Sequence, residues 1–149
     1  LLRKNENLNG ILIKNGFPVR ETIPNKSSDK TFLWIARADE FKRPHLLLRL
    51  AQALKQYRFI MVIAGQGEFK ENIVAQAGEI KNITLVESLS LRDTFKLFEA
   101  SWCLINTSAV EGFPNTFIQA GLTKTPILSF QVNPEGILEK WNNFLCCLL

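Results

Sequence analysis

The sequence contains few of the residues from which metal sites and disulfide scaffolds are built. Of its 149 residues, three are cysteine and one, His45, is histidine, and no cysteine stands at a ligand-like spacing from that histidine. Cys146 and Cys147 are adjacent in the chain, and adjacent cysteines rarely bridge each other. We therefore expect a reduced, cytoplasmic setting and no metal site.

The chain also lacks long apolar runs and clusters of basic residues. No apolar run of about 20 residues occurs, so no segment is expected to span a bilayer. The formal net charge of +4 mildly favours anionic partners, such as nucleotide phosphates or an acidic membrane surface. The basic residues are dispersed, which argues against a nucleic-acid partner. Neither a GxxxxGK[ST] phosphate loop nor a recognisable Ser/His/Asp arrangement is present.

What the chain does have is a regular alternation of strand and helix patterns. With 46% hydrophobic and 21% charged residues, it can form one packed domain. Apolar, β-branched runs predict strands over residues 11–13, 31–37, 58–64, 82–87, 102–106 and 126–130. Helices are expected from Pro44, over 68–78, over 91–101, from Pro114 to Thr123, and over 135–141. This alternation predicts an α/β, Rossmann-like three-layer sandwich, in which a parallel sheet has helices on both faces.

Both ends of the chain read as interrupted elements. Residues 1–4 look like the tail of a helix, and residues 144–149 form an apolar run that looks like the start of another element. We interpret residues 1–149 as a single domain taken from a longer protein, with residues 1–30 as a partial segment that leads into it.

An acid placed just before a proline-led apolar helix is the strongest functional signal. Pro114 suits a first helical position, and the residue before it has no side-chain oxygen to cap the helix. The backbone N–H groups near Asn115 and Thr116 are therefore expected to be open to an anion. Glu111 stands before this helix and Gln119 lies eight residues after Glu111. Together these groups predict a cradle for a phosphorylated sugar.

The residues to which the sequence patterns give a role, here and below, also have simpler interpretations. Glu111 could be a solvated acid that the helix dipole stabilises by ~0.3–1 kcal/mol. Arg37 and Lys42 could be solvated, as charged residues usually are. The turn Gly65-Gln66-Gly67 could be a tight turn with no ligand.

Five short pieces, in order, resemble the C-terminal half of a group 1 glycosyltransferase, the large retaining family (family 4) with the two-domain GT-B architecture. The pieces are Asn15-Gly16, Ile35-Ala36-Arg37 with Lys42, Ala64-Gly65-Gln66-Gly67, the E-x7-E-like segment from Glu111 to Gln119, and Thr125-Pro126-Ile127-Leu128. The resemblance extends from about residue 8 to about residue 140.

The resemblance implies roles on the phosphate and sugar side of a donor. Arg37 and Lys42 would bind the diphosphate of a nucleotide sugar, and their charges suit two adjacent phosphates. The same charges would stabilise the departing nucleoside diphosphate, so no metal or other cofactor is required. Glu111 would hold hydroxyls of the donor sugar near the reacting carbon.

The remaining implied roles concern the helix start and the nucleoside. Asn115 and Thr116 would offer backbone N–H groups to the phosphates. Gln119 stands where the family usually has a second glutamate for the ribose, and an amide lacks the charge and the two equivalent oxygens of a carboxylate. Gly65 and Gly67 would line the donor site, and the loop at Glu87-Ser88 would border the base.

Other departures from the family pattern fall at glycine positions. Ala36, Arg43 and Lys124 each stand where glycine is usual, so the helix before Lys124 is expected to stop in another way. The acceptor-binding N-terminal half of the family is not part of this sequence.

The resemblance thus implies a glycosyltransferase donor-binding domain. The full enzyme would transfer a sugar to a hydroxyl acceptor with retention, in glycan, lipopolysaccharide or capsule-type biosynthesis. Its expected location is the cytoplasm, with association with the cytoplasmic membrane face left open. Gly65, Gly67 and Glu87 leave an NAD(P)-binding dehydrogenase or epimerase domain as an alternative, although Lys70 replaces the third glycine. A non-catalytic α/β interaction module is the third reading.

Overall fold

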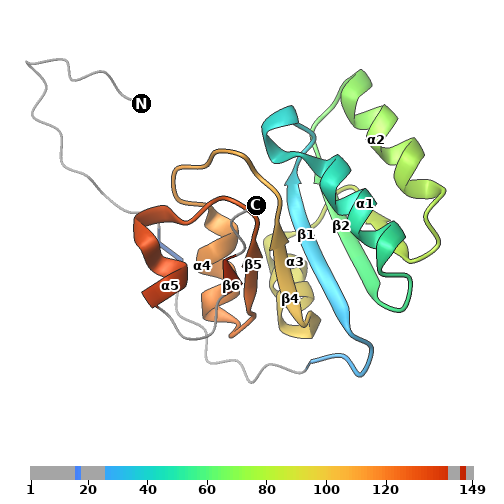
Figure 1. The fold of residues 1–149 in the computed structure, drawn as a ribbon. Coiled ribbons are helices and arrows are strands. Elements are labelled where there is room, and N and C mark those ends of the chain that lie inside the picture. Colours follow the sequence, from blue (N-terminus) through green and yellow to red (C-terminus); the bar gives the residue numbers. More distant parts are fainter. Residues whose placement is uncertain (1–15, 18–25, 141–144, 147–149) are drawn as a thin grey trace, which may run out of the picture.

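The chain forms one parallel sheet with helices packed on both faces (Figure 1). The computed structural model describes residues 16–17, 26–140 and 145–146. The strands are β1 (Thr31–Arg37), β2 (Arg58–Ala64), β3 (Ile83–Val86), β4 (Cys103–Asn106), β5 (Ile127–Ser129) and β6 (Leu145–Cys146). The helices are α1 (Pro44–Ala53), α2 (Glu68–Gly78), α3 (Leu91–Ala100), α4 (Asn115–Leu122) and α5 (Ile137–Lys140), with short 3-10 turns η1 (Glu40–Lys42) and η2 (Pro134–Gly136). The expected fold class is confirmed.

The strand order is β3-β2-β1-β4-β5-β6, and every neighbouring pair is parallel. Strands β2 and β3 are added in turn on one side of β1. The chain then crosses back, and β4, β5 and β6 are added in turn on the other side of β1. Between β1 and β4 the winding direction reverses, and ligands of such sheets bind beyond the carboxyl ends of the strands at this switch point. The topology therefore places the candidate site at the ends of β1 and β4.

Two apolar layers sandwich the sheet. One layer packs α1 and α2 against β1 and β2 through side chains that include Trp34, Leu47 and Phe59. The other packs α3, α4 and α5 against the opposite face through side chains that include Leu33 and Phe117. Strand β2 is nearly continuously apolar because its alternate side chains enter the two layers.

The pairing between β1 and β4 is short. Strand β1 is in register with β2 over seven residue pairs but with β4 over only two, Phe32 with Cys103 and Leu33 with Leu104. The carboxyl ends of β1 and β4, next to the candidate site, are therefore not held together by a continuous backbone ladder.

Four details differ from the sequence expectations. Pro114 is not the first residue of α4 but precedes it in an extended conformation, with φ −65° and ψ 128°. Lys124 takes the glycine-like conformation itself, with φ 52°, so α4 does not stop in another way. Trp102, expected as the first residue of a strand, precedes β4 and is 42% exposed, and its Nε1–H donates to the Ser27 carbonyl. The last expected helix is divided into η2 and α5, because Glu135 has a φ of 54°.

The end of α4 shows how Lys124 replaces the usual glycine. The Lys124 N–H donates to the Gly121 carbonyl at 3.2 Å, and the Thr125 N–H donates to the Ala120 carbonyl at 2.8 Å. This is the Schellman arrangement, which satisfies carbonyls in the last turn of a helix. The expected strand over 11–13 and most of both chain ends lie outside the described residues.

Candidate functional site at the switch point

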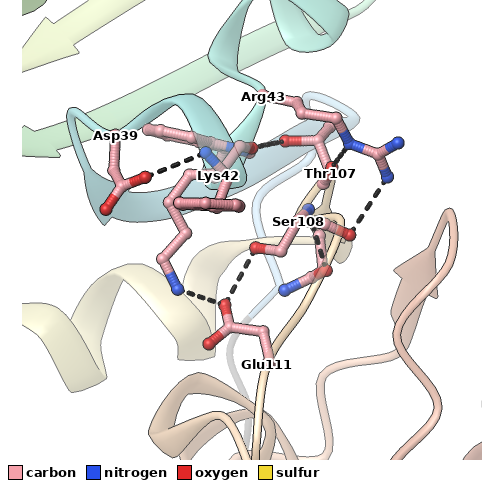
Figure 2. Close-up of polar contacts among 9 residues, drawn as sticks. Asp39, Lys42, Arg43, Thr107, Ser108 and Glu111 are labelled. Atoms are coloured by element: carbon pink, nitrogen blue, oxygen red, sulfur yellow. Dashed lines mark hydrogen bonds and ion pairs between the residues drawn. The ribbon is translucent and has the colours of Figure 1, made fainter.

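Glu111 and Lys42 meet at the carboxyl ends of β4 and β1. Lys42 follows β1 in η1, and its ammonium group forms an ion pair with Oε1 of Glu111 (Figure 2). The hydroxyl of Ser108, in the loop after β4, donates to the same oxygen at 2.8 Å. The two charged side chains are only 19% and 17% exposed, so the pair is partly desolvated. The structure thus joins two of the residues that the sequence analysis selected.

Both members of this ion pair have hydrogen-bonding groups that the described contacts leave available to a ligand. Both recorded hydrogen bonds to the Glu111 carboxylate use Oε1, and none to Oε2 is present among the residues that the structure describes. The Lys42 ammonium has three donors and uses one on Glu111. A ligand with hydroxyls beside Glu111 and an anion beside Lys42 matches these open positions.

The two loops that carry this pair are fastened to each other. The Arg43 guanidinium donates through Nε to the Thr107 carbonyl at 2.7 Å and through Nη2 to the Ser108 carbonyl at 3.1 Å. The Thr107 hydroxyl donates to the Lys42 carbonyl (Figure 2). It also accepts from Nε1 of Trp34 at 2.9 Å. The Ala109 N–H donates to the carbonyl of the residue before Lys42 at 2.7 Å. We call these contacts between residues 41–43 and 107–109 the loop clasp.

The sequence analysis gave no role to Arg43, Thr107 or Ser108. A signal was nevertheless present, because Asn106, Thr107 and Ser108 form a polar run directly after the apolar part of β4. These three residues are 8% exposed or less, and a buried polar run at the end of a parallel strand is typical of a site.

Arg37 is the last residue of β1 and is exposed. Because successive strand residues alternate between faces, Arg37 shares the face of Leu33 and Ile35, which is the face that α4 covers. Among the described residues, no recorded contact joins Arg37 to Glu111. Its role at the diphosphate stays a prediction.

The start of α4 has no side-chain cap, since Pro114 offers none. Asn115 and Thr116 form the first turn of α4. This turn follows the loop that carries Glu111, beyond the carboxyl end of β4. Gln119 lies one turn after Asn115 and is only 7% exposed, yet its side-chain amide has no hydrogen bond recorded within the described part of the chain. Buried polar groups normally have partners. This amide is therefore a polar group that a ligand could satisfy.

The turn after β2 requires both of its glycines. Gly65 and Gly67 have φ values of 103° and 100°, which side chains rarely adopt. A cavity of about 500 Å³ lies beside this turn, and its lining includes Lys70 and Glu87. Lys70 donates to Glu87 at 2.6 Å, and this hydrogen bond holds the pKa of the Glu87 carboxyl below its usual value.

A second cavity, of about 290 Å³, lies between α4 and α5. Its lining is made of apolar side chains, among them Phe117, Ile118 and Leu138, together with Gly121. Because none of them carries a charge, this cavity has nothing with which to hold a phosphate.

Comparison with known proteins identifies the family. The model of the glycosyl transferases group 1 family matches residues 18–143 of this chain. The chain belongs to the group 1 glycosyltransferases. No curated protein gives a significant match.

Solved structures agree with this glycosyltransferase assignment at the level of the fold. A mutant of S. aureus TarM in complex with fondaparinux, α-GlcNAc-glycerol and UDP superimposes with a TM-score of 0.74 at 21% identity, over 92% of this chain and 29% of that chain. The lipopolysaccharide outer core galactosyltransferase WaaB gives 0.63 at 21% identity, over 86% and 39%. The pneumococcal O-GlcNAc transferase GtfA, in complex with UDP and GlcNAc, gives 0.58 at 19% identity, over 76% and 23%. The glycosyltransferase chain described here thus spans well under half the length of these proteins.

The family assignment decides against the dehydrogenase alternative. In that reading, Glu87 would hold a cofactor ribose, but here it is paired with Lys70, which stands at the third-glycine position. Within residues 26–140, no three His, Cys, Asp or Glu side chains lie close enough to hold a metal ion. No helix in the described part of this glycosyltransferase chain is long and apolar enough to cross a membrane.

Proposed function

We propose that this chain is the donor-binding domain of an enzyme that transfers a sugar from a nucleoside diphosphate to a hydroxyl acceptor with retention. Its expected setting is glycan, lipopolysaccharide or capsule-type biosynthesis in the cytoplasm or at the cytoplasmic membrane face. The observation that carries the proposal is the Lys42–Glu111–Ser108 cluster at the switch point.

The order of the strands supports a direction for the bound donor. The glycine turn and its cavity lie at β2 and β3, Arg37 ends β1, and Glu111 follows β4. Neighbouring strands are about 4.8 Å apart, so the loops after β3 and β4 are separated by three spacings, or roughly 14 Å. An extended nucleotide sugar can span such a distance, with the base at the cavity, the diphosphate at β1 and the sugar at Glu111.

The chemistry then follows from charge. As the bond between the anomeric carbon and the diphosphate oxygen breaks, negative charge grows on the leaving nucleoside diphosphate. Arg37, Lys42 and the positive end of the α4 dipole would stabilise that charge. Oε2 of Glu111 would accept hydrogen bonds from the sugar hydroxyls. The acceptor would be bound by the acceptor-binding half of the enzyme, with its hydroxyl directed at the anomeric carbon.

In this proposal Gln119 would contact the ribose of the donor. It follows Asn115 by one turn on the same face of α4, and its buried amide can accept from a ribose hydroxyl. Because an amide has no charge, we expect ribose binding that is weaker than a glutamate would give, but not absent.

A nucleotide panel tests the proposal. Uridine, guanosine and adenosine diphosphate, and their sugar conjugates, are added to the chain and its thermal unfolding is recorded. A ligand at about 100 times its Kd adds ~2.7 kcal/mol to the free energy of unfolding. We expect at least one nucleoside diphosphate to raise the Tm.

Two lysine variants show where the ligand binds. Lys42→Met should reduce the Tm shift, whereas Lys55→Met should preserve it, because Lys55 is exposed in the turn at the opposite end of α1. If no nucleoside diphosphate or nucleotide sugar changes the Tm at millimolar concentration, the proposal is wrong. Binding to anionic vesicles in place of nucleotides would favour the non-catalytic module.

A further inference from the structure

We infer that Arg43 is a positioning residue that sets the diphosphate affinity of this site without touching the ligand. It does so by holding the loop of Lys42 against the loop of Glu111. The inference rests on the proposed function and adds to it a residue that no motif of the chain indicated.

The backbone at Arg43 is unfavourable for an arginine. Its φ of 46° and ψ of 54° lie in the left-handed region, which residues with a side chain rarely occupy. It directly precedes α1 and gives that helix no side-chain cap. Local conformation alone would favour glycine here, so the guanidinium must contribute something that offsets the strain.

What it contributes is a connection across the switch point. Arg43 donates to the carbonyls of two successive residues, Thr107 and Ser108, at 2.7 and 3.1 Å (Figure 2). The planar guanidinium fixes the direction of both bonds, and a lysine at this position could not reproduce this geometry. Because the β1–β4 register ends at Leu33 and Leu104, the strand ladder does not reach these loops, and the backbone hydrogen bond from Ala109 to Phe41 is supplemented by the two bonds of Arg43.

The Lys42 ammonium and the Glu111 carboxylate, which would face the ligand, are each directly linked to the loop clasp. Lys42 is the residue before Arg43, and its own carbonyl accepts from the Thr107 hydroxyl. Ser108 accepts from Arg43 through its carbonyl and donates to Glu111 through its hydroxyl. If the arginine is lost, the loop clasp loses two of its hydrogen bonds, the relative position of the ammonium and the carboxylate is less firmly fixed, and more of the site must be ordered when the ligand binds.

A matched pair of arginine variants separates contact from charge. Arg43→Gln and Arg49→Gln remove the same charge, and Arg49 is exposed on α1. Uridine, guanosine and adenosine diphosphate are each titrated into both variants by calorimetry. We expect Arg43→Gln to raise the Kd of the bound diphosphate roughly tenfold, and Arg49→Gln to change it less than twofold.

Two further variants separate positioning from folding. Arg43→Gly relieves the left-handed strain, so it should keep a Tm near that of the unsubstituted chain while still binding the diphosphate weakly. In a Lys42→Met background, Arg43→Gln should have little further effect on Kd, because the arginine acts through that lysine.

The outcomes are distinct. If the unsubstituted chain binds a diphosphate and Arg43→Gln binds it equally well, this inference is overturned and the proposed function survives. Equal weakening by Arg43→Gln and Arg49→Gln, or full additivity with Lys42→Met, would also overturn it. If the unsubstituted chain binds no diphosphate, the proposed function and this inference fall together.

Discussion

Substituting the two members of the central ion pair should change nucleoside diphosphate affinity in opposite directions. Glu111→Gln removes a negative charge that repels the phosphates and releases the Lys42 ammonium from its present partner. Lys42→Met removes the attraction itself. We therefore expect the first variant to bind uridine diphosphate, or whichever nucleoside diphosphate binds, more tightly, and the second to bind it more weakly.

The size of the effect follows from the exposure of the pair. Two unit charges about 4 Å apart interact by ~1 kcal/mol in water and by ~4 kcal/mol at an effective dielectric constant of 20. Both side chains keep somewhat under a fifth of their surface exposed, so the environment lies between these limits. After the cost of desolvation, we expect about 1–2 kcal/mol in each direction, which is roughly a five- to thirtyfold change in Kd.

Calorimetric titration of both variants measures these changes, with Glu79→Gln as a control. Glu79 is exposed and follows α2 at its far end, so its loss should leave the Kd nearly unchanged. A Glu111→Gln variant that binds the diphosphate more weakly would show that the carboxylate does not compete for Lys42. It would then contribute to phosphate binding indirectly, and the charge argument above would be refuted.

Three further predictions concern single positions. Lys124→Gly should raise the free energy of unfolding by about 0.5–1 kcal/mol, because glycine adopts the left-handed φ of 52° without strain. Urea unfolding measures this change, and a lower free energy of unfolding would contradict the prediction. Gln119→Glu should increase the preference for uridine diphosphate over its 2′-deoxy form, and burying the acid should cost about 1–3 kcal/mol in the free energy of unfolding. If the ratio of the two Kd values is unchanged, this position does not belong to the ribose site. Burial raises the pKa of the Cys103 thiol from 9.0 to about 11, so the folded state binds the thiol proton more tightly and stability should fall as pH rises from 9 to 11. Unfolding in a chain with serine at Cys146 and Cys147 tests this, and a flat pH profile would refute it.

The sequence was sufficient for the order of elements because the apolar patterns are simple. Strand β2 is predictable as an apolar run bounded by Arg58 and the glycine turn, and α3 begins at the expected residue, Leu91, after Ser90 caps it through the Asp93 N–H. The ends of elements were less predictable, as Pro114 shows. Proline is compatible with an extended conformation just before a helix as well as with the first helical position, and only the surrounding loop decides between them.

The candidate site was predicted in part. The spacing from Glu111 to Gln119 indicated the acid and the amide, and the family resemblance implied a role for Lys42. The ion pair itself was not predictable, since 69 residues separate its partners. Arg43 was noted only as a missing glycine, because neither its conformation nor its bonds to main-chain carbonyls leave a pattern in the sequence.

The contact between Trp34 and Thr107 gives this protein an optical probe of its own crevice. The indole is 2% exposed in the core layer under α1 and α2, yet its N–H is bonded to the hydroxyl that also holds the Lys42 carbonyl. Emission from a dry, hydrogen-bonded indole responds to small changes in that bond, whereas Trp102 at the surface is open to a soluble quencher. In a Trp141→Phe variant, rearrangement beside Lys42 on ligand binding can thus be followed as quencher-resistant fluorescence, with no label attached.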